Sequence, residues 1–270
     1  MSEDALIDPG PKSLDHATRV IQPPMDRILS ERDHRPYGMP EGPHAMTMRW
    51  HDLLFAHWPV SVESLRPHVP AGLEIETFGG SAWLGVVPFR MRGVRPRLVP
   101  ERLGMAFPEL NVRTYVRSGK RAGVWFFSLD ATSKLAVRGA RFSFGLPYFD
   151  ARVRCSRDGA YIDFSSERTH RRAAQAQLAV TYGPTGQAFH AAPDTLDYFL
   201  TERYCLFSVL RDGTLSYCDI HHLPWPLQPA EAAWQTNSMG RQIGIALPEA
   251  APVLHFARHL YMAAWAPRPL

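Results

Sequence analysis

Hydrophobic and polar residues alternate with a period of two along much of this chain, which is the pattern of β-strands with one buried face. The run from Leu110 to Arg117 shows it most clearly, and the turn Ser118-Gly119-Lys120 follows. Residues 124–129 come next, are apolar on both faces, and are therefore predicted to form a central strand. The same pattern predicts strands at 49–58, 148–155, 160–165, 177–182, 203–210 and 214–220, and a hairpin joining 73–77 to 83–91 through Gly79-Gly80.

Helix signals are few. Residues 61–69, 132–140 and 194–202 are the best candidates, with Ser61 and Asp194 as N-caps of the first and the last. Many antiparallel strands with a few short helices predict an α+β domain that is mainly antiparallel β. We expect its sheet to close or curl strongly, because closure removes exposed strand edges.

The first 43 residues differ in composition from the rest of the chain. They hold seven prolines among many charged residues and only short apolar stretches, a composition typical of disorder. From His44 onward aromatic residues recur regularly, and no segment repeats at a fixed period. We therefore predict a disordered proline-rich N-terminal arm at 1–43 and a single compact domain at 44–270.

Composition and charge exclude several classes of protein. With 45% apolar residues the chain can bury a core, so disorder throughout is excluded. The net charge of +4 comes from scattered arginines, so no nucleic-acid partner is predicted. The mean hydropathy is −0.22, and no apolar run reaches the ~18 residues of a membrane span. Without a secretory leader in its first residues, the chain is predicted to be soluble and cytoplasmic.

Common catalytic and cofactor motifs are absent from the sequence. It has no glycine-rich nucleotide loop, no HExxH and no GxSxG, and its three cysteines form no CxxC pair, so we predict no cofactor. The densest group of metal-ligand residues is Cys218, Asp219, His221 and His222. We expect packing and hydrogen-bonding roles for this group, and no metal site.

Two segments carry candidate binding residues. Glu109, Asn111 and Arg113 share one face of a strand, so they are solvated if that face lies outside, and they must pair or bind something if the sheet closes around them. His51 and His57, six residues apart on another strand, are predicted to face the same side, where His51 would line a pocket.

Arg141 belongs to a second candidate segment, in which an isolated cation precedes several aromatic residues and the turn Gly145-Leu146-Pro147. An arginine in such a setting either stacks structurally or binds an anion through its two-pronged guanidinium. The turn is followed directly by Tyr148.

Taken together, the motifs resemble the YqjF-like family of uncharacterised bacterial proteins, over about residues 46 to 265. That family resembles the acetoacetate decarboxylase superfamily by distant similarity. The motifs that carry the resemblance are Met48–Phe55, Ala82–Phe89, Glu109–Val116, Gly123–Ala131, Gly145–Tyr148 and His222–Gln228.

The resemblance implies a cone-shaped, mainly antiparallel β-barrel with an internal cavity. Laid on the decarboxylase pattern, Glu109, Arg141 and Gly145-Leu146-Pro147 match a glutamate, an arginine and a Gly-Phe-Pro turn. Tyr148 then stands in place of the Schiff-base lysine, and a phenol cannot form an imine. Lysine-dependent decarboxylation is therefore not expected, and Lys134, the nearest other amine, is expected to be solvated.

The leading hypothesis is an internal cavity that acts on a small organic keto acid without a Schiff-base lysine. Glu109 would serve as general acid or base, Arg141 would hold an oxyanion and Tyr148 would donate a hydrogen bond, while His51, Asn111 and Arg113 would contact the substrate. One alternative is a non-catalytic binding protein on the same barrel. Another is a purely structural ion pair between Arg141 and Glu109. A homo-oligomer remains open.

Overall fold

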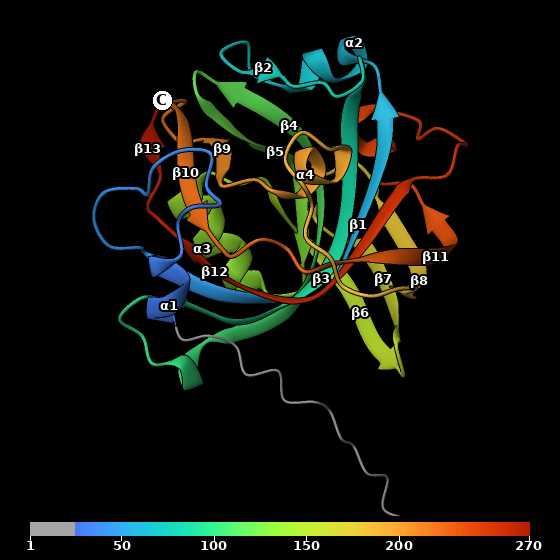
Figure 1. The fold of residues 1–270 in the computed structure, drawn as a ribbon. Coiled ribbons are helices and arrows are strands. Elements are labelled where there is room, and N and C mark those ends of the chain that lie inside the picture. The colour runs from blue at the N-terminus through green and yellow to red at the C-terminus, as the bar shows by residue number, and fades with distance from the viewer. Residues whose placement is uncertain (1–24) are drawn as a thin grey trace, which may run out of the picture.

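The computed structural model describes residues 25–270, apart from four side chains in one helix (Figure 1). Most of the chain lies in strands that pair into one sheet, mainly antiparallel, which confirms the predicted fold class. The strands are β1 Met46–Val60, β2 Glu74–Ile75, β3 Ala82–Pro96, β4 Met105–Ser118, β5 Arg121–Ala131, β6 Tyr148–Asp158, β7 Tyr161–Arg168, β8 Gln177–Pro184, β9 Cys205–Val209, β10 Leu215–His221, β11 Leu227–Asn237, β12 Val253–Ala264 and β13 Arg268–Pro269.

The helices are short, as predicted. Ser61 caps α2 by accepting a hydrogen bond from the Ser64 amide, whereas α4 is capped by Thr195 and not by Asp194, which has a positive φ. None of the helices in the described part of the chain is long and apolar enough to cross a membrane. The helices are α1 Met25–Ser30, α2 Val62–Leu65, α3 Lys134–Phe144 and α4 Leu196–Thr201, with short 3₁₀ turns at Arg66–His68, Glu101–Leu103 and Arg241–Ile243.

Seven of the strands close into a ring. Their pairing order is β10, β9, β5, β4, β3, β1 and β12, and pairing of β12 with β10 completes the circle. Strand β5 is central, because it pairs with β4, β9 and β6. The remaining long strands β6, β7, β8 and β11 form an extension that packs outside the ring (Figure 1).

The core has two parts, one on each side of the ring wall. Alternation along β4 sends Phe107 and Tyr115 to the inner cluster, and Leu110 and Val112 to the outer one. The outer cluster fills the space between the ring and the β6–β8 extension, from which Phe164 contributes. Residues on β4 that face inward are therefore enclosed, as the closed-sheet alternative requires.

The predicted hairpin between 73–77 and 83–91 is wrong. Phe78 and Ser81 do bridge across the Gly79-Gly80 turn, but β2 leaves β3 and pairs with β4 instead. The hairpins β4–β5, β6–β7 and β9–β10 are present, and so is the strand predicted at 177–182. Strands β11 and β12 were not predicted from the sequence.

Residues 25–43 are not the disordered arm that their composition suggests. This segment runs along β10 (Figure 1), where Ile28 is buried and Arg35 donates a 2.7 Å hydrogen bond to the Ile220 carbonyl. His34 lies 2.8 Å from the His222 carbonyl oxygen. Hydrogen bonds to strand carbonyls thus hold a proline-containing segment in which α1 is the only helix or strand. The rest of the predicted arm, 1–24, lies outside the described residues.

Candidate functional site

The interior of the ring contains a pocket of about 370 Å³. Its wall is almost entirely apolar, and five methionines contribute to it. Glu109, Asn111 and Tyr148 are the main polar residues of the wall. The other lining residues include Met46, Met48, Trp50, Phe89, Met91, Met105, Phe107, Phe126, Leu129, Phe144, Leu206 and Met262.

Glu109 and Tyr148 meet at this pocket. Glu109 is fully buried, and the Tyr148 hydroxyl donates a 2.9 Å hydrogen bond to its Oε2. The other oxygen, Oε1, is buried and has no hydrogen-bond partner among the described residues. An unpaired buried carboxyl oxygen is costly, so a group that can bind it gains a ready-made partner.

Burial dominates the ionisation of both groups. Desolvation raises the pKa of Glu109 to about 8, against the opposing effect of the polar groups of Tyr148 and Asn111. The pKa of Tyr148 is raised well above its ordinary value, first by burial and then by the neighbouring Glu109. At neutral pH Glu109 is therefore mostly a neutral acid and Tyr148 a neutral phenol.

A sharp turn delivers Tyr148 to the pocket. Gly145 ends α3 with a φ of 63°, and a Cβ at this position would lie 2.4 Å from the Val209 carbonyl oxygen. Only glycine fits that combination of left-handed backbone and close approach to β9. The chain then enters β6, where Tyr148 pairs with Leu129 in parallel register and faces inward.

Asn111 and Arg113 extend the polar row of Glu109 deeper into the ring. Asn111 also borders a second, smaller chamber of about 50 Å³, which shares several wall residues with the pocket. Arg113 lines this inner chamber and exposes 9% of its surface. Its Nη2 donates to the carbonyl of Leu200 at 3.2 Å and to the hydroxyl of Tyr115 at 3.4 Å. The predicted convergence of Glu109, Asn111 and Arg113 on one inner face is thus present.

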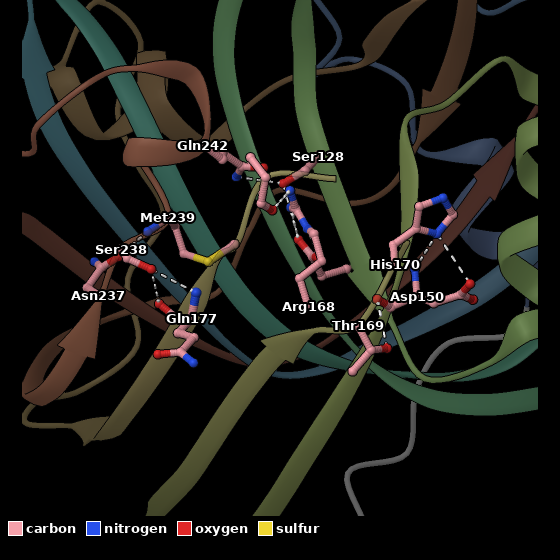
Figure 2. A network of polar contacts seen from close by, with 12 residues as sticks. Ser128, Asp150, Arg168, Thr169, His170, Gln177, Asn237, Ser238, Met239 and Gln242 are labelled. Atoms are coloured by element: carbon pink, nitrogen blue, oxygen red, sulfur yellow. Dashed lines mark hydrogen bonds and ion pairs between the residues drawn. The ribbon is translucent and has the colours of Figure 1, made fainter. Parts of the chain in front are cut away.

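A second buried carboxyl lies directly behind this site, on the outer face of β5. Asp130 receives two hydrogen bonds from Arg168, at 2.7 and 2.6 Å, and a third from Ser128 at 3.2 Å. Gln242 in turn donates to Ser128 over 2.9 Å (Figure 2). Sequence reasoning missed this network, because Asp130 and Arg168 are far apart in the chain and carry no motif.

His51 does not line the pocket, contrary to the prediction. Asp52 has a φ of 51° and begins a bulge in β1 across which the register with β3 shifts. A bulge exchanges the two faces of a strand. As a result Trp50 faces the interior, whereas His51 faces His259 on the outside. Burial lowers the pKa of His51 to about 4. Of the two histidines, only His57 points inward, where it stacks with Phe55.

The bulge is held by its own charges. The carboxylate of Asp52 accepts hydrogen bonds from Arg90 and, at 2.8 Å, from Arg258, and these arginines hold its pKa below the ordinary value despite burial. Tyr182 donates to the Asp52 carbonyl at 2.7 Å.

Arg141 does not reach the pocket either. It lies on an exposed face of α3, where its guanidinium approaches His170 Nε2 at 3.3 Å. His170 also lies 3.3 Å from Asp150, a contact visible in Figure 2. Neither an oxyanion contact in the pocket nor the alternative ion pair with Glu109 is compatible with this position. The reason is that α3 continues to Phe144, so the helix face that carries Phe144 and Ser143 meets the pocket and the Arg141 face does not.

The remaining candidates have separate structural partners. His221 lies 2.7 Å from the Ile28 carbonyl, His222 lies 2.7 Å from the Leu223 carbonyl, and Asp219 lies 3.6 Å from Arg121. Within residues 25–270 no group of three metal-binding side chains was found. The side chain of Lys134 lies outside the described residues.

Comparison with known proteins places the chain in a family. The profile of DUF2071, described as an uncharacterized conserved protein, matches residues 47–261. The chain belongs to this family. It is 46% identical over 228 residues to the uncharacterized protein YqjF of Bacillus subtilis strain 168, covering 84% of this chain and 93% of that protein. The resemblance to the YqjF-like family is thereby confirmed.

Solved structures with the same fold include acetoacetate decarboxylases. The acetoacetate decarboxylase of Legionella pneumophila aligns with this DUF2071 member with a TM-score of 0.56 and 13% identity, over 91% of this chain and 94% of its own. The enduracididine biosynthesis enzyme MppR, complexed with the condensation product of pyruvate and imidazole 4-carboxaldehyde, aligns with a TM-score of 0.62 and 12% identity, over 88% and 92%. At these identities the likeness establishes the fold.

Proposed function

We propose that the protein binds a small, mostly apolar molecule with a carbonyl group inside the ring, and that Glu109 acts on it as a general acid and base. The observation that carries this proposal is the unpaired Oε1 of Glu109, a buried carboxyl with a pKa of about 8 in the wall of an apolar pocket. A perturbed carboxyl in a cavity is typical of acid–base sites.

The hydrogen bond from Tyr148 determines which oxygen of Glu109 carries the acidic proton. Because Tyr148 donates to Oε2, the proton of the neutral acid resides on Oε1, the oxygen without a protein partner. The neutral acid therefore donates a hydrogen bond to a ligand carbonyl. Once Oε1 has released its proton to solvent, it takes the proton from the carbon next to that carbonyl, and the electron pair of the C–H bond passes to the carbonyl oxygen as an enolate. Return of a solvent-derived proton from Glu109 to the carbon restores the ketone. Such a carboxyl exchanges α-hydrogens with solvent without any lysine.

The apolar wall restricts the class of ligand. Its methionine side chains are unbranched and adapt to different shapes, so they favour aliphatic or aromatic groups over sugars or nucleotides. The MppR structures were determined with pyruvate and with a pyruvate condensation product, and these carbonyl compounds bind within the same fold. The wall supports an apolar ligand, and the MppR complexes support a carbonyl group in it.

The proposal is tested by deuterium exchange at the α-carbon of short methyl ketones, followed by NMR. The wild type is expected to accelerate exchange, with a rate that rises with pH and levels off above about pH 8, as the basic form of Glu109 accumulates. Glu109→Gln is expected to abolish the acceleration while ketone binding persists. Absence of any ketone binding to the wild type would overturn the proposal.

A non-catalytic binding protein is the second candidate. The observation that favours it is that no lysine is among the described residues that line the pocket, and that Tyr148 stands in the place of the Schiff-base lysine. Binding of ketones without any acceleration of exchange, at any pH between 5 and 9, would decide for this candidate.

A further inference from the structure

Arg113 is a buried cation without a carboxylate partner. It exposes 9% of its surface, and no aspartate or glutamate of residues 25–270 forms a salt bridge with it. Its polar contacts are the Leu200 carbonyl and the Tyr115 hydroxyl, and Phe55 lies 5.2 Å below its guanidinium carbon. Its Nε is buried and unpaired. A buried charge in this condition destabilises the folded protein unless a counter-charge binds to it.

The neighbouring charges do not supply that counter-charge. Glu76 is the nearby carboxylate, and both Arg203 and Arg117 bind it. His57 is fully buried, and burial together with the charge of Arg113 holds its pKa well below the ordinary value, so it is neutral. The inner chamber therefore carries positive charge, and its wall includes Arg113 and Arg203 beside apolar groups.

The inner chamber and the pocket share part of their walls. Both are bordered by Asn111 and by shared apolar residues such as Trp50 and Phe126. Asn111 Oδ1 is buried without a partner, midway along the row. A strand rises about 3.3 Å per residue, so the Cα atoms of Glu109 and Arg113 lie about 13 Å apart, and the Arg113 guanidinium contacts Tyr115, the next inward residue beyond it, and the Leu200 carbonyl. A ligand that reaches both must carry its two polar ends well apart.

We infer that Arg113 binds the carboxylate of the ligand, and that the ligand is an oxo acid whose carbonyl and carboxylate are separated by several methylene groups. This inference rests on the proposed function, because Glu109 takes the carbonyl end. An acid of the acetoacetate type has one carbon between the two groups and is too short to reach both residues. Neutral Glu109 does not repel the anion, and a guanidinium with a free N–H suits a carboxylate.

The test uses calorimetric binding of linear methyl-ketone acids, lengthened by one methylene at a time from acetoacetate, against methyl ketones of the same length. In the wild type the longer acids are expected to bind at least about tenfold tighter than their matched ketones, and acetoacetate to show no such preference. Arg113→Gln is expected to abolish the preference without weakening ketone binding. The surface substitution Arg92→Gln serves as the control and leaves the preference intact.

Each other outcome is decisive. If ketones bind but no acid binds more tightly, or if the preference survives Arg113→Gln, the inference fails and the proposed function stands. If neither acids nor ketones bind, both fail. Should Arg113→Gln not fold, Arg113→Lys keeps the charge but loses the planar fork, and it is expected to retain a reduced preference for acids.

Discussion

Two buried carboxyls lie back to back across the same pair of strands, and they are treated in opposite ways. On the outer face Asp130 is neutralised by two hydrogen bonds from Arg168, whose guanidinium also lies 4.1 Å from the Phe149 ring. On the inner face Glu109 receives a hydrogen bond from the uncharged Tyr148 and leaves one oxygen unpaired. Burial is nearly the same for both, so burial alone does not make a site. The feature that distinguishes Glu109 from Asp130 is the missing counter-charge.

The largest expected effect comes from breaking the outer pair. Arg168→Met leaves Asp130 buried and without its cation, which should lower the free energy of unfolding by about 3–5 kcal/mol at neutral pH. Urea denaturation measures this loss. Arg152→Met, which breaks an exposed pair with Glu167, should change it by less than about 1 kcal/mol. Equal losses in the two variants would contradict the assignment of Asp130 and Arg168 as the structural pair.

Removing the inner carboxyl should increase the free energy of unfolding, whereas breaking the outer pair should decrease it. The pKa of Glu109 rises from an ordinary value of 4.5 in the unfolded chain to about 8 in the folded protein. The unfolded chain therefore releases its proton first, so Glu109 reduces stability progressively between pH 4.5 and 8. Glu109→Gln should be more stable than the wild type by about 3 kcal/mol at pH 7, and equal to it below pH 4.5.

Denaturation at a series of pH values measures this difference. Glu249→Gln, an exposed glutamate, should show no such pH-dependent gain. A Glu109→Gln variant that is less stable than the wild type at pH 7 would mean that the carboxylate is paired in the folded protein, contrary to the geometry.

A smaller effect is expected when the link between the two inner groups is cut. Tyr148→Phe removes the donor to Glu109 Oε2, which should cost about 1–2 kcal/mol and raise the pKa of Glu109 further, since that hydrogen bond lowers it. Carbon-13 NMR titration of the glutamates reads the pKa directly. Tyr161→Phe, whose hydroxyl binds Glu231 at the surface, should leave the pKa of Glu109 unchanged.

The smallest effect is expected at Arg141. Because Arg141 is exposed and its guanidinium approaches a surface histidine, His170, Arg141→Ala should change stability by less than about 0.5 kcal/mol and leave ketone binding unaltered. Arg138→Ala on the same helix is the matched control. Loss of ligand binding in Arg141→Ala alone would restore the role that the sequence suggested for it.

Local patterns explain which parts of the site could be predicted. Glu109, Asn111 and Arg113 follow from strict alternation on one strand, which needs only the knowledge that the sheet closes. The prediction for His51 fails because the left-handed residue Asp52 begins a bulge that exchanges the two faces of the strand. An aspartate signals such a bulge only weakly. The prediction for Arg141 fails because its helix ends where Gly145 contacts β9, and β9 lies far along the chain.

Long-range pairing explains what the sequence could not reveal about the fold. The hairpins joined by Gly119, Gly159 and Gly213 were predicted, since their turns are local. The departure of β2 to pair with β4, and the closure of the ring by β12, depend on contacts between residues distant in sequence. The Asp130–Arg168 pair is of the same kind, because it forms only when β7 packs behind β5.

The position of β12 in the ring also has a consequence for biosynthesis. β1 is the first of the ring strands to be translated, yet one of its two edges pairs with β12, the last, as in the contact of Met46 with Ala264. Until β12 has left the ribosome, the methionine-rich wall has an open side and presents apolar surface to its surroundings. Enclosure of the pocket therefore has to wait for β12, and until that strand pairs with β1 the partly formed ring exposes apolar surface that favours aggregation.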